Sequence, residues 1–281
     1  MYIIAEVGVN HDGYLDKAIN LITAAKECGC DAVKFQSFYA DRLVHPSAKK
    51  VDYQLRSGDE SESHYEMIKK LEFNGTNFKK AFEYASKINI DFITTPYDPF
   101  SAKEAYDCGV RKFKTASADL SDLYLHNKIS SFKDVEVIIA TGMSDIKTIK
   151  NTISIYKNTK PTILHCVSEY PCSDGSLNLN CINLLKKNFK NHKIGFSDHS
   201  IDNVPSLIAA SIGYEYFERH FTLNKKDEGP DQYASSDVNE MKNYVEQIRR
   251  CKRIKGLETK TIQKEEMGMS NRSKKAILSK V

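Results

Sequence analysis

The 281-residue sequence has no tryptophan, and it also lacks the features that mark several classes of protein. No apolar run approaches the ~18 residues that a membrane-spanning helix needs, so we expect no membrane association. The N-terminus has no basic region followed by an apolar stretch and a cleavage site, so we predict no signal peptide. The net charge of +4 is small, and no block of Lys and Arg argues for nucleic-acid binding.

Cysteine is present in an odd number, seven, and without the spacing of a metal site. The pair Cys28-Gly29-Cys30 is CxC and not CxxC, and no second pair follows at metal-binding distance. We therefore expect reduced thiols and a cytoplasmic protein.

Apolar, β-rich runs alternate with helical stretches along most of the chain. Strands are predicted at 3–8, 31–36, 91–96, 111–117, 135–142, 161–166, 193–198 and 214–220. Helices are predicted at 15–29, 77–89, 101–109, 146–158, 178–189, 204–213 and 238–254. Eight β/α units predict an α/β protein with a parallel sheet, a (β/α)8 or TIM barrel over residues 1–255. A doubly wound open sheet is the alternative, but it usually carries GxGxxG where this chain has "GVNHDG".

One connection, residues 37–74, is much longer than the others. Residues 63–73 within it have the pattern of an extra helix. Long connections in compact domains are often functional, so this one is either a loop over the substrate or an interface, or a neutral insertion.

Polar residues stand at the C-terminal ends of the predicted strands, where barrels of this kind carry their chemistry. Side chains alternate faces along a strand, so Lys34 and Gln36 share a face, which we expect to point inward. Glu218 and His220 also share a face. Arg219 lies on the opposite face, where a structural ion pair is the expected role.

The residue types at these ends predict two kinds of binding. Lys34 and Lys114, with hydroxyl groups at Thr95, Ser117 and Ser197, suit a phosphate or a carboxylate. A single histidine is more often structural, but His199 and His220 end adjacent strands, and two imidazoles suit a divalent metal that also takes water or substrate oxygen. From the first strand, Glu6 is placed to act as a general base.

The motifs at these ends are similar to those of the sialic acid synthase family, which comprises N-acetylneuraminate, legionaminate and pseudaminate synthases. The resemblance covers residues 2–255. The motifs occur in order: "IIAEVGVNHDG" (3–13), "AVKFQ" (32–36), "TTPYD" (94–98), "KTASAD" (114–119), "ATGMS" (140–144), "GFSDHS" (195–200), "FERHFT" (217–222) and "GPD" (229–231).

The resemblance implies condensation of phosphoenolpyruvate with an open-chain N-acyl hexosamine, giving a nine-carbon 3-deoxy-2-ulosonic acid, with phosphate leaving by C–O cleavage. It implies a divalent metal, Mn²⁺ foremost with Mg²⁺ or Co²⁺ as alternatives, held by His199 and His220. Glu6 would orient or deprotonate the attacking water. Phosphoenolpyruvate would be bound by Lys34, Thr95, Lys114, Ser117 and Ser197, and the sugar by Gln36, Asp119, Tyr170 and Asp231.

Several positions depart from the family's pattern. Asp119 stands where the family often has Glu, and Ala140, Ser168 and Gln232 also differ, which leaves the sugar open: N-acetylmannosamine or a diacetamido analogue. Residues 256–281 resemble the linker and first strand of the family's small C-terminal antifreeze-like domain, which would be absent or truncated here. The resemblance also admits a homodimer.

Two other functions stay open from the residues alone. A barrel lysine with a lowered pKa could form a Schiff base with pyruvate, which would make Lys114 the nucleophile of an aldolase. The chain could also be an inactive, sugar-binding remnant.

Overall fold

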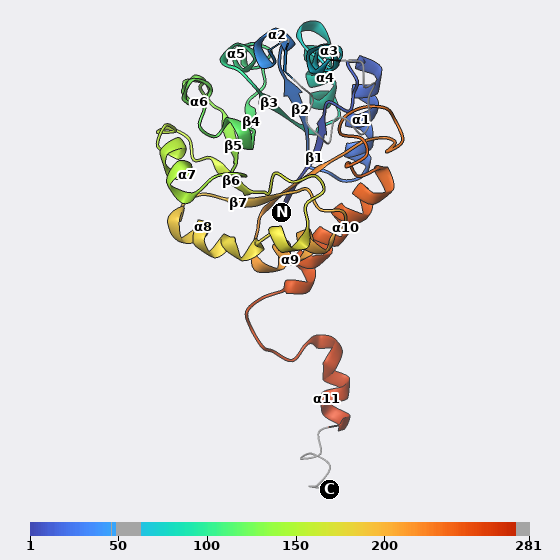
Figure 1. Ribbon diagram of the computed structural model, residues 1–281. Coiled ribbons are helices and arrows are strands. Elements are labelled where there is room, and N and C mark those ends of the chain that lie inside the picture. The colour runs from blue at the N-terminus through green and yellow to red at the C-terminus, as the bar shows by residue number, and fades with distance from the viewer. Residues whose placement is uncertain (46, 49–62, 274–281) are drawn as a thin grey trace.

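The computed structural model describes residues 1–45, 47–48 and 63–273. Its strands close into one parallel barrel in sequence order (Figure 1). β8 pairs with β1, with Ile4 opposite Glu218, so the barrel is confirmed and the open-sheet alternative is wrong. The strands are β1 (Tyr2–Gly8), β2 (Ala32–Ser37), β3 (Asp91–Pro96), β4 (Lys112–Thr115), β5 (Glu136–Ala140), β6 (Thr162–His165), β7 (Ile194–Asp198) and β8 (Tyr216–His220).

Helices surround the barrel on its outside (Figure 1). They are α1 (Leu15–Glu27), α4 (Gly75–Lys87), α5 (Pro99–Asp107), α6 (Leu123–Ser130), α7 (Ile146–Ile153), α8 (Ile182–Asn188), α9 (Val204–Ile212) and α10 (Val238–Lys255). No helix range was predicted between β4 and β5, where α6 lies. It is short, and its N-cap is Asp122, whose side chain accepts a hydrogen bond from Leu125 N.

The barrel interior is apolar toward the N-terminal ends of the strands and polar toward their C-terminal ends. Outward-facing strand residues such as Ile3, Ala5 and Val33 pack under the helices in the main core. The lower inward positions form a separate apolar floor, made of Ile4, Ala32, Ile93, Ile138, Leu164 and Tyr216. Glu6 and Lys34 lie two residues further along the same faces as Ile4 and Ala32. The charged groups therefore stand on a dry floor at the C-terminal end of the barrel.

The long connection after β2 carries two short helices, α2 (Ala40–Leu43) and α3 (His64–Lys70). The predicted extra helix at 63–73 is thus confirmed in shorter form, with a capping box between Ser63 and Glu66. Val9, Phe38, Met67 and Leu71 form a cluster that joins α3 to the barrel mouth. Residues 46 and 49–62 of this connection lie outside the described part of the chain.

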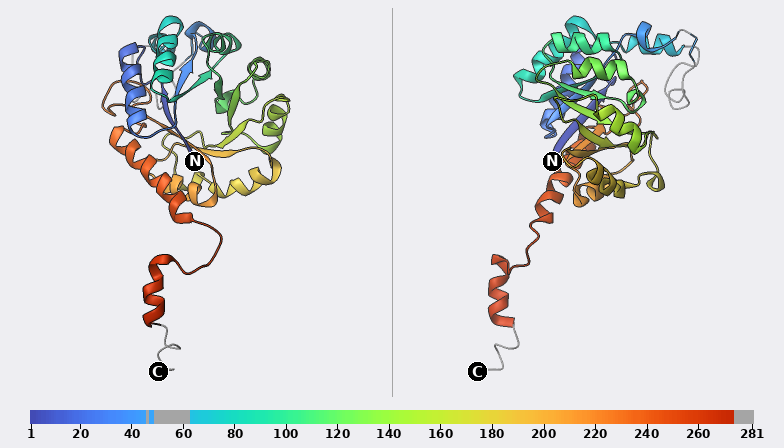
Figure 2. Two further views of the ribbon diagram at one scale, coloured as in Figure 1. Left: turned by 180° about the vertical axis from the view of Figure 1, so that it is seen from behind. Right: turned by 90° about the vertical axis from the view of Figure 1, so that its left-hand side faces the viewer.

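Beyond α10 the chain leads away from the barrel to a 3₁₀ turn (Lys264–Glu266) and to α11 (Met267–Ser273), as Figure 2 shows. The expected strand of a further domain is not present up to Ser273, and residues 274–281 lie outside the description, so that expectation stays a prediction. Within the described residues, no helix is long and apolar enough to cross a membrane.

Gly195 on β7 is predicted to be indispensable for packing of the floor. A Cβ on this residue would lie 2.5 Å from Tyr216 Cβ and 2.7 Å from the Tyr216 carbonyl oxygen, and it would also meet the Leu164 side chain. Because such overpacking forces backbone shifts, Gly195→Ala should lower the free energy of unfolding by ~1–3 kcal/mol in urea titrations. Gly175→Ala is the control, since a Cβ there meets no described atom within 4 Å. Equal stability of the two variants would contradict this packing.

Candidate active site

A cavity of about 910 Å³ opens at the C-terminal ends of the strands. Its wall contains every predicted site residue except Asp119, as far as the described residues define it: Glu6, Lys34, Gln36, Thr95, Lys114, Ser117, Tyr170, Ser197, His199, His220 and Asp231. The barrel therefore brings together side chains from strands that are far apart in the sequence.

Two lysine–glutamate pairs lie at the bottom of this cavity. Lys34 Nζ is 2.6 Å from Glu6 Oε2, and Lys114 Nζ is 3.1 Å from Glu218 Oε1. All four side chains are buried, with at most 6% of each residue exposed. Buried charges are tolerated only when they are paired, so the two carboxylates here neutralise the two ammonium groups.

The contacts within these pairs shift the pKa values of Lys114, Glu218 and Glu6. Burial lowers the pKa of Lys114, but the carboxylates of Glu218 and Glu6 outweigh it and raise the pKa above its usual value. Burial raises the pKa of Glu218, yet Lys114 and Lys34 together hold it below its ordinary range. For Glu6 burial prevails over Lys34, and its pKa is raised. Lys114 is therefore a cation, and Glu6 is the more basic of the two carboxylates.

Hydroxyl groups stand around the two ammonium groups. Thr95 Oγ1 accepts a hydrogen bond from Lys34 Nζ at 2.8 Å, and Ser197 Oγ donates to Glu218 Oε1 at 2.9 Å. Ser117 Oγ accepts from the backbone N–H of Gly142 at 3.1 Å. Two ammonium groups and three hydroxyl groups in one cavity wall are the groups that typically bind a phosphate or a carboxylate, and we call this part of the wall the anion subsite.

The two histidines face each other across neighbouring strand ends, with ring centroids 5.9 Å apart. His199 Nδ1 donates to the Val167 carbonyl oxygen at 2.6 Å, so Nε2 carries the lone pair, and its contact with Ser197 Oγ is long, at 3.4 Å. His220 Nδ1 is buried and has no hydrogen-bond partner among the described residues. Burial lowers the pKa of both rings, that of His199 to about 3, and the proximity of His220 adds to the effect. Both imidazoles are therefore neutral.

This arrangement fits a divalent metal ion. Neutral imidazole is the form that binds metals, and a backbone carbonyl that fixes one ring nitrogen, as Val167 does for His199, is typical of metal-binding histidines. The unpartnered nitrogen of His220 is a group that an ion would satisfy. Within the described ranges no group of three or more His, Cys, Asp or Glu is placed to hold a metal. An ion here would have two protein ligands and open positions for water or substrate.

Two of the predicted sugar-contacting residues, Tyr170 and Asp231, lie next to the histidines, and a third, Gln36, lies next to Glu6. The ring of Tyr170 packs on His199 with centroids 4.1 Å apart. Asp231 Oδ2 is 3.9 Å from His220 Nδ1, and burial raises the pKa of this carboxyl. Gln36 Nε2 lies 3.4 Å from Glu6 Oε1. These groups form a polar wall above the anion subsite.

The loop that carries Asp231 is fixed by the loop after β1. Asn10 Nδ2 donates to the Phe221 carbonyl oxygen and to Ser235 Oγ, both at 2.9 Å. Gln232 Nε2 donates to Asp12 Oδ1 at 2.8 Å. Gln232 is fully buried and is not part of the cavity wall described above, so its departure from the family's pattern changes this tether and not the wall.

Asp119 does not lie where the sequence suggested. It ends a 3₁₀ turn, Ser117–Asp119, of which Ser117 and Ala118 line the cavity and the aspartate does not. Its Oδ2 is buried without a hydrogen-bond partner in the described part of the chain. A tight turn sends consecutive side chains in different directions, and strand parity does not extend to it.

Some residues of the wall were not among the predicted site residues. Glu218 is one, although its shared parity with His220 had pointed to it. Cys166, Phe38 and Tyr97 are others, and nothing in the sequence separates their apolar side chains from those of the core. Arg219 is on the outer face, as parity predicted, and pairs with Asp198 at 3.4 Å.

The NeuB family model matches residues 21–260 of the sequence. The chain belongs to the NeuB family. N,N'-diacetyllegionaminic acid synthase of Legionella pneumophila is 37% identical over 263 residues, 91% of this chain and 73% of that protein. The enzyme of the same name from Campylobacter jejuni is 36% identical over an alignment of 283 positions that covers 99% of this chain and 84% of that protein.

A solved structure with the same architecture is N-acetylneuraminic acid (sialic acid) synthetase from Leptospira borgpetersenii. It superposes with a TM-score of 0.83 at 29% identity, over 98% of this chain and 92% of that one. The sequence comparison and the structural comparison therefore lead to the same family and the same barrel fold, over most of the chain.

In this NeuB family chain Asp119 predicts a pH-dependent stability. Burial, with a contribution from Asp122, raises the pKa of its carboxyl to about 6. The folded state thus holds this proton more tightly than the unfolded chain, whose pKa is about 3.9, so stability falls as pH rises from about 4 to about 6 and stays low above. Asp119→Asn removes the buried charge and should be more stable than the parent by about 2 kcal/mol at pH 8.

That advantage should fall to less than half at pH 4.5, measured by urea unfolding at both pH values. Asp174→Asn, at an exposed position, is the control and should show no such difference. A constant advantage at both pH values would show that the Asp119 carboxyl titrates normally.

Proposed function

We propose that this chain is a nonulosonic acid synthase that condenses phosphoenolpyruvate with an open-chain N-acyl hexosamine. The observation that carries the proposal is one cavity with two buried ammonium groups beside two neutral imidazoles. Membership in the NeuB family, with diacetyllegionaminic acid synthases among the relatives, supports the same reaction.

The anion subsite suits phosphoenolpyruvate. Lys34 and Lys114 are compact positive charges, and each already has a carboxylate partner that an incoming phosphate or carboxylate can replace. Thr95, Ser117 and Ser197 supply the hydroxyl groups that complete hydrogen bonding to its oxygens. Because charged hydrogen bonds strengthen in a dry site, the apolar floor beneath increases the affinity of this subsite.

We propose that His199 and His220 hold a divalent cation, Mn²⁺ in the first place, with Mg²⁺ and Co²⁺ as alternatives. When bound, this ion would supply a Lewis acid for the aldehyde oxygen of the sugar. Tyr170 and Asp231 lie next to the histidines and Gln36 lies next to Glu6, and these three residues would orient the sugar hydroxyl groups.

The reaction proposed for these residues joins C3 of phosphoenolpyruvate to the aldehyde carbon. Water adds at C2, and the bond between C2 and the bridging oxygen of the phosphate breaks, so that phosphate leaves with that oxygen and C2 becomes a ketone. The former aldehyde oxygen takes up a proton that the water releases and becomes a hydroxyl group. Glu6 is the base that takes the proton from this water, since burial keeps its pKa above the usual value. Lys34 and Lys114 neutralise the charge of the departing phosphate.

The sugar remains a narrower proposal. The named relatives favour a hexosamine with two N-acyl groups over N-acetylmannosamine. Of the positions that depart from the family's pattern, Ala140 and Ser168 line the cavity and are placed to change sugar recognition.

A lysine-dependent aldolase is disfavoured by the state of Lys114. A Schiff base needs a free amine, but the contact with Glu218 keeps the pKa of Lys114 above its ordinary value. An inactive remnant is disfavoured because the cationic pair, the hydroxyl groups, the base and the two imidazoles are all present. A cytoplasmic location stays a proposal that the seven free thiols support, and a homodimer stays one without further support here.

The decisive experiment uses phosphoenolpyruvate with ¹⁸O in the C2–O–P bridge, together with Mn²⁺ and a panel of sugars: N-acetylmannosamine and the 2,4-diacetamido analogues. The label should appear in the released phosphate, and mass spectrometry should show a nine-carbon acid, with the diacetamido sugar turned over fastest. EDTA should abolish turnover and Mn²⁺ restore it. Turnover that survives EDTA, with a borohydride-trapped pyruvate adduct, would point to the aldolase instead.

A second prediction concerns His199→Ala and His220→Ala. Each should lose most of the affinity for Mn²⁺ in calorimetric titrations and most of the activity, while the unfolding temperature stays near that of the parent, because strand-end residues serve function more than stability. His192→Ala is the control, since its ring bonds the Pro161 carbonyl oxygen away from the cavity. Full activity in either site variant would refute the assignment of the ligands.

A further inference from the structure

Two tripeptides at the ends of β7 and β8 lie in register, residue against residue. Ser197 pairs with Glu218 and Asp198 with Arg219. On the inner face Ser197 Oγ donates to Glu218, and on the outer face Arg219 contacts Asp198 Oδ2 at 3.4 Å. One residue further along each chain stand the two imidazoles, His199 and His220. Side-chain contacts therefore join the ends of β7 and β8 on both faces of the sheet, directly before the two histidines.

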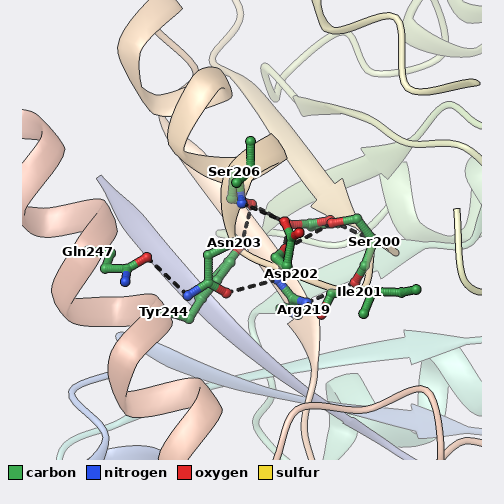
Figure 3. Close-up of polar contacts among 10 residues, drawn as sticks. Ser200, Ile201, Asp202, Asn203, Ser206, Arg219, Tyr244 and Gln247 are labelled. Carbon is green, nitrogen blue, oxygen red and sulfur yellow. Dashed lines mark hydrogen bonds and ion pairs between the residues drawn. The ribbon is translucent and has the colours of Figure 1, made fainter. Parts of the chain in front are cut away.

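The outer cross-link reaches well beyond the ladder. Arg219 donates to the carbonyl oxygens of Ser200, Ile201 and Asp202 at 2.8, 2.9 and 2.8 Å, and to Asn203 Oδ1 at 3.3 Å. Figure 3 shows its guanidinium enclosed by this segment. Only 6% of Arg219 is exposed. One side chain therefore fixes the four residues that directly follow His199.

Asp198 closes the same network from the other side. Its Oδ1 accepts from the backbone N–H of Ser200 at 2.9 Å, and its Oδ2 accepts from Ser206 Oγ on α9 at 2.5 Å. Ser206 is in turn bonded to Tyr244 of α10 at 2.9 Å, and the Arg219 guanidinium lies 5.1 Å from the centre of the Tyr244 ring. The network joins two strand ends to two helices (Figure 3).

The two histidines differ in how the backbone holds them. His220 is the last residue of β8 and lies opposite Glu6 of β1 in the ladder. His199 is the first residue after β7, so no strand partner fixes it. Its backbone carbonyl accepts from Cys172 N, and its ring bonds Val167. The position of His199 consequently depends on these two contacts and on the segment that directly follows it, which Arg219 encloses.

We infer that Arg219 and Asp198 are positioning residues whose contacts behind the barrel wall set the spacing of the His199 and His220 rings for a divalent cation. We call this pair, with its contacts to residues 200–203, the Arg219–Asp198 clamp. The inference rests on the proposed metal role of the histidines. It assigns a function to a buried ion pair that touches neither cavity nor substrate, since its groups lie on the outer face.

The geometry explains why arginine is needed. A guanidinium presents several N–H donors in a rigid plane, and Arg219 uses two of its nitrogens to reach four acceptors of one segment as well as Asp198. Lysine keeps the charge but not the fork. Arg219→Lys therefore leaves Asp198 with a cation and releases most of the segment after His199, which separates loss of positioning from loss of charge.

The test measures Mn²⁺ affinity of the full chain by calorimetry and by the electron paramagnetic resonance signal of free Mn²⁺. Arg219→Lys should bind Mn²⁺ about 10- to 100-fold more weakly, as expected for loss of a group that orients a ligand. Affinity for phosphoenolpyruvate without metal should change less than twofold. Excess Mn²⁺ should restore much of the turnover. Asp198→Asn, which keeps one acceptor oxygen for Ser200 but removes the charge that faces Arg219 and the second acceptor, which Ser206 uses, is the alternative variant if the lysine variant does not fold.

Lys112→Met is the matched control. It breaks ion pairs with Asp91 and Glu136 at the opposite end of the barrel, so it lowers stability without touching the histidines. Unchanged Mn²⁺ affinity in both clamp variants, or an equal loss in Lys112→Met, would overturn the inference and reduce the pair to a structural role.

A second readout needs no metal. Imidazole ¹H–¹⁵N spectra of the metal-free protein should show shifted ring signals of His199, and to a smaller extent of His220, in Arg219→Lys but not in Lys112→Met. If the parent binds no divalent cation, the metal role in the proposed function fails, and these spectra still decide the clamp. Ring signals identical to the parent's would refute it.

Discussion

The pairing of β8 with β1 is the constraint on which the whole site depends. It sets Glu6 opposite His220 and Ile4 opposite Glu218, although more than two hundred residues separate them in the chain. Once this seam is closed, strand parity leaves little freedom, since every second side chain must enter the barrel. Glu6, the two lysines and His220 then converge because the barrel is narrow, whereas His199, the first residue after β7, is also held by contacts with the loop after β6.

Electrostatics follows from what lies beneath that seam. The floor of Ile4, Ala32, Ile93, Ile138, Leu164 and Tyr216 excludes water, so charges placed above it must be neutralised by the protein itself. The carboxylates of Glu6 and Glu218 do this, and they hold the lysines in place before any substrate arrives. Such preorganisation reduces the reorganisation that an anion must induce on binding. The same dry environment lowers the pKa of both imidazoles and keeps them neutral, the form in which imidazole binds metal ions.

Strand parity is a local rule, and its reach explains which parts of the site the sequence could predict. It correctly placed Lys34, Gln36 and His220 inward and Arg219 outward, because a strand has only two faces. Strand parity could not predict the direction of the Asp119 side chain, because this residue lies on a 3₁₀ turn and not on a strand. Helix α6 escaped prediction because it has only eight residues and two of its apolar side chains, Leu123 and Tyr124, are exposed, which weakens the helical periodicity. The contacts of Arg219 depend on how residues 200–203 fold back.

The two faces of β7 and β8 differ in what their side chains contact: those on the inner face line the cavity, and those on the outer face bond to the surrounding protein. A side chain on the inner face that is to bind a ligand must keep polar atoms without a partner in the protein. Nδ1 of His220 is such an atom among the described residues. The outer face has no such duty, and there Asp198 and Arg219 satisfy nearly every donor and acceptor they have. A rigid outer layer therefore compensates for an inner layer that binding requires to be incomplete, and residues 197–199 and 218–220 contain both layers in consecutive positions.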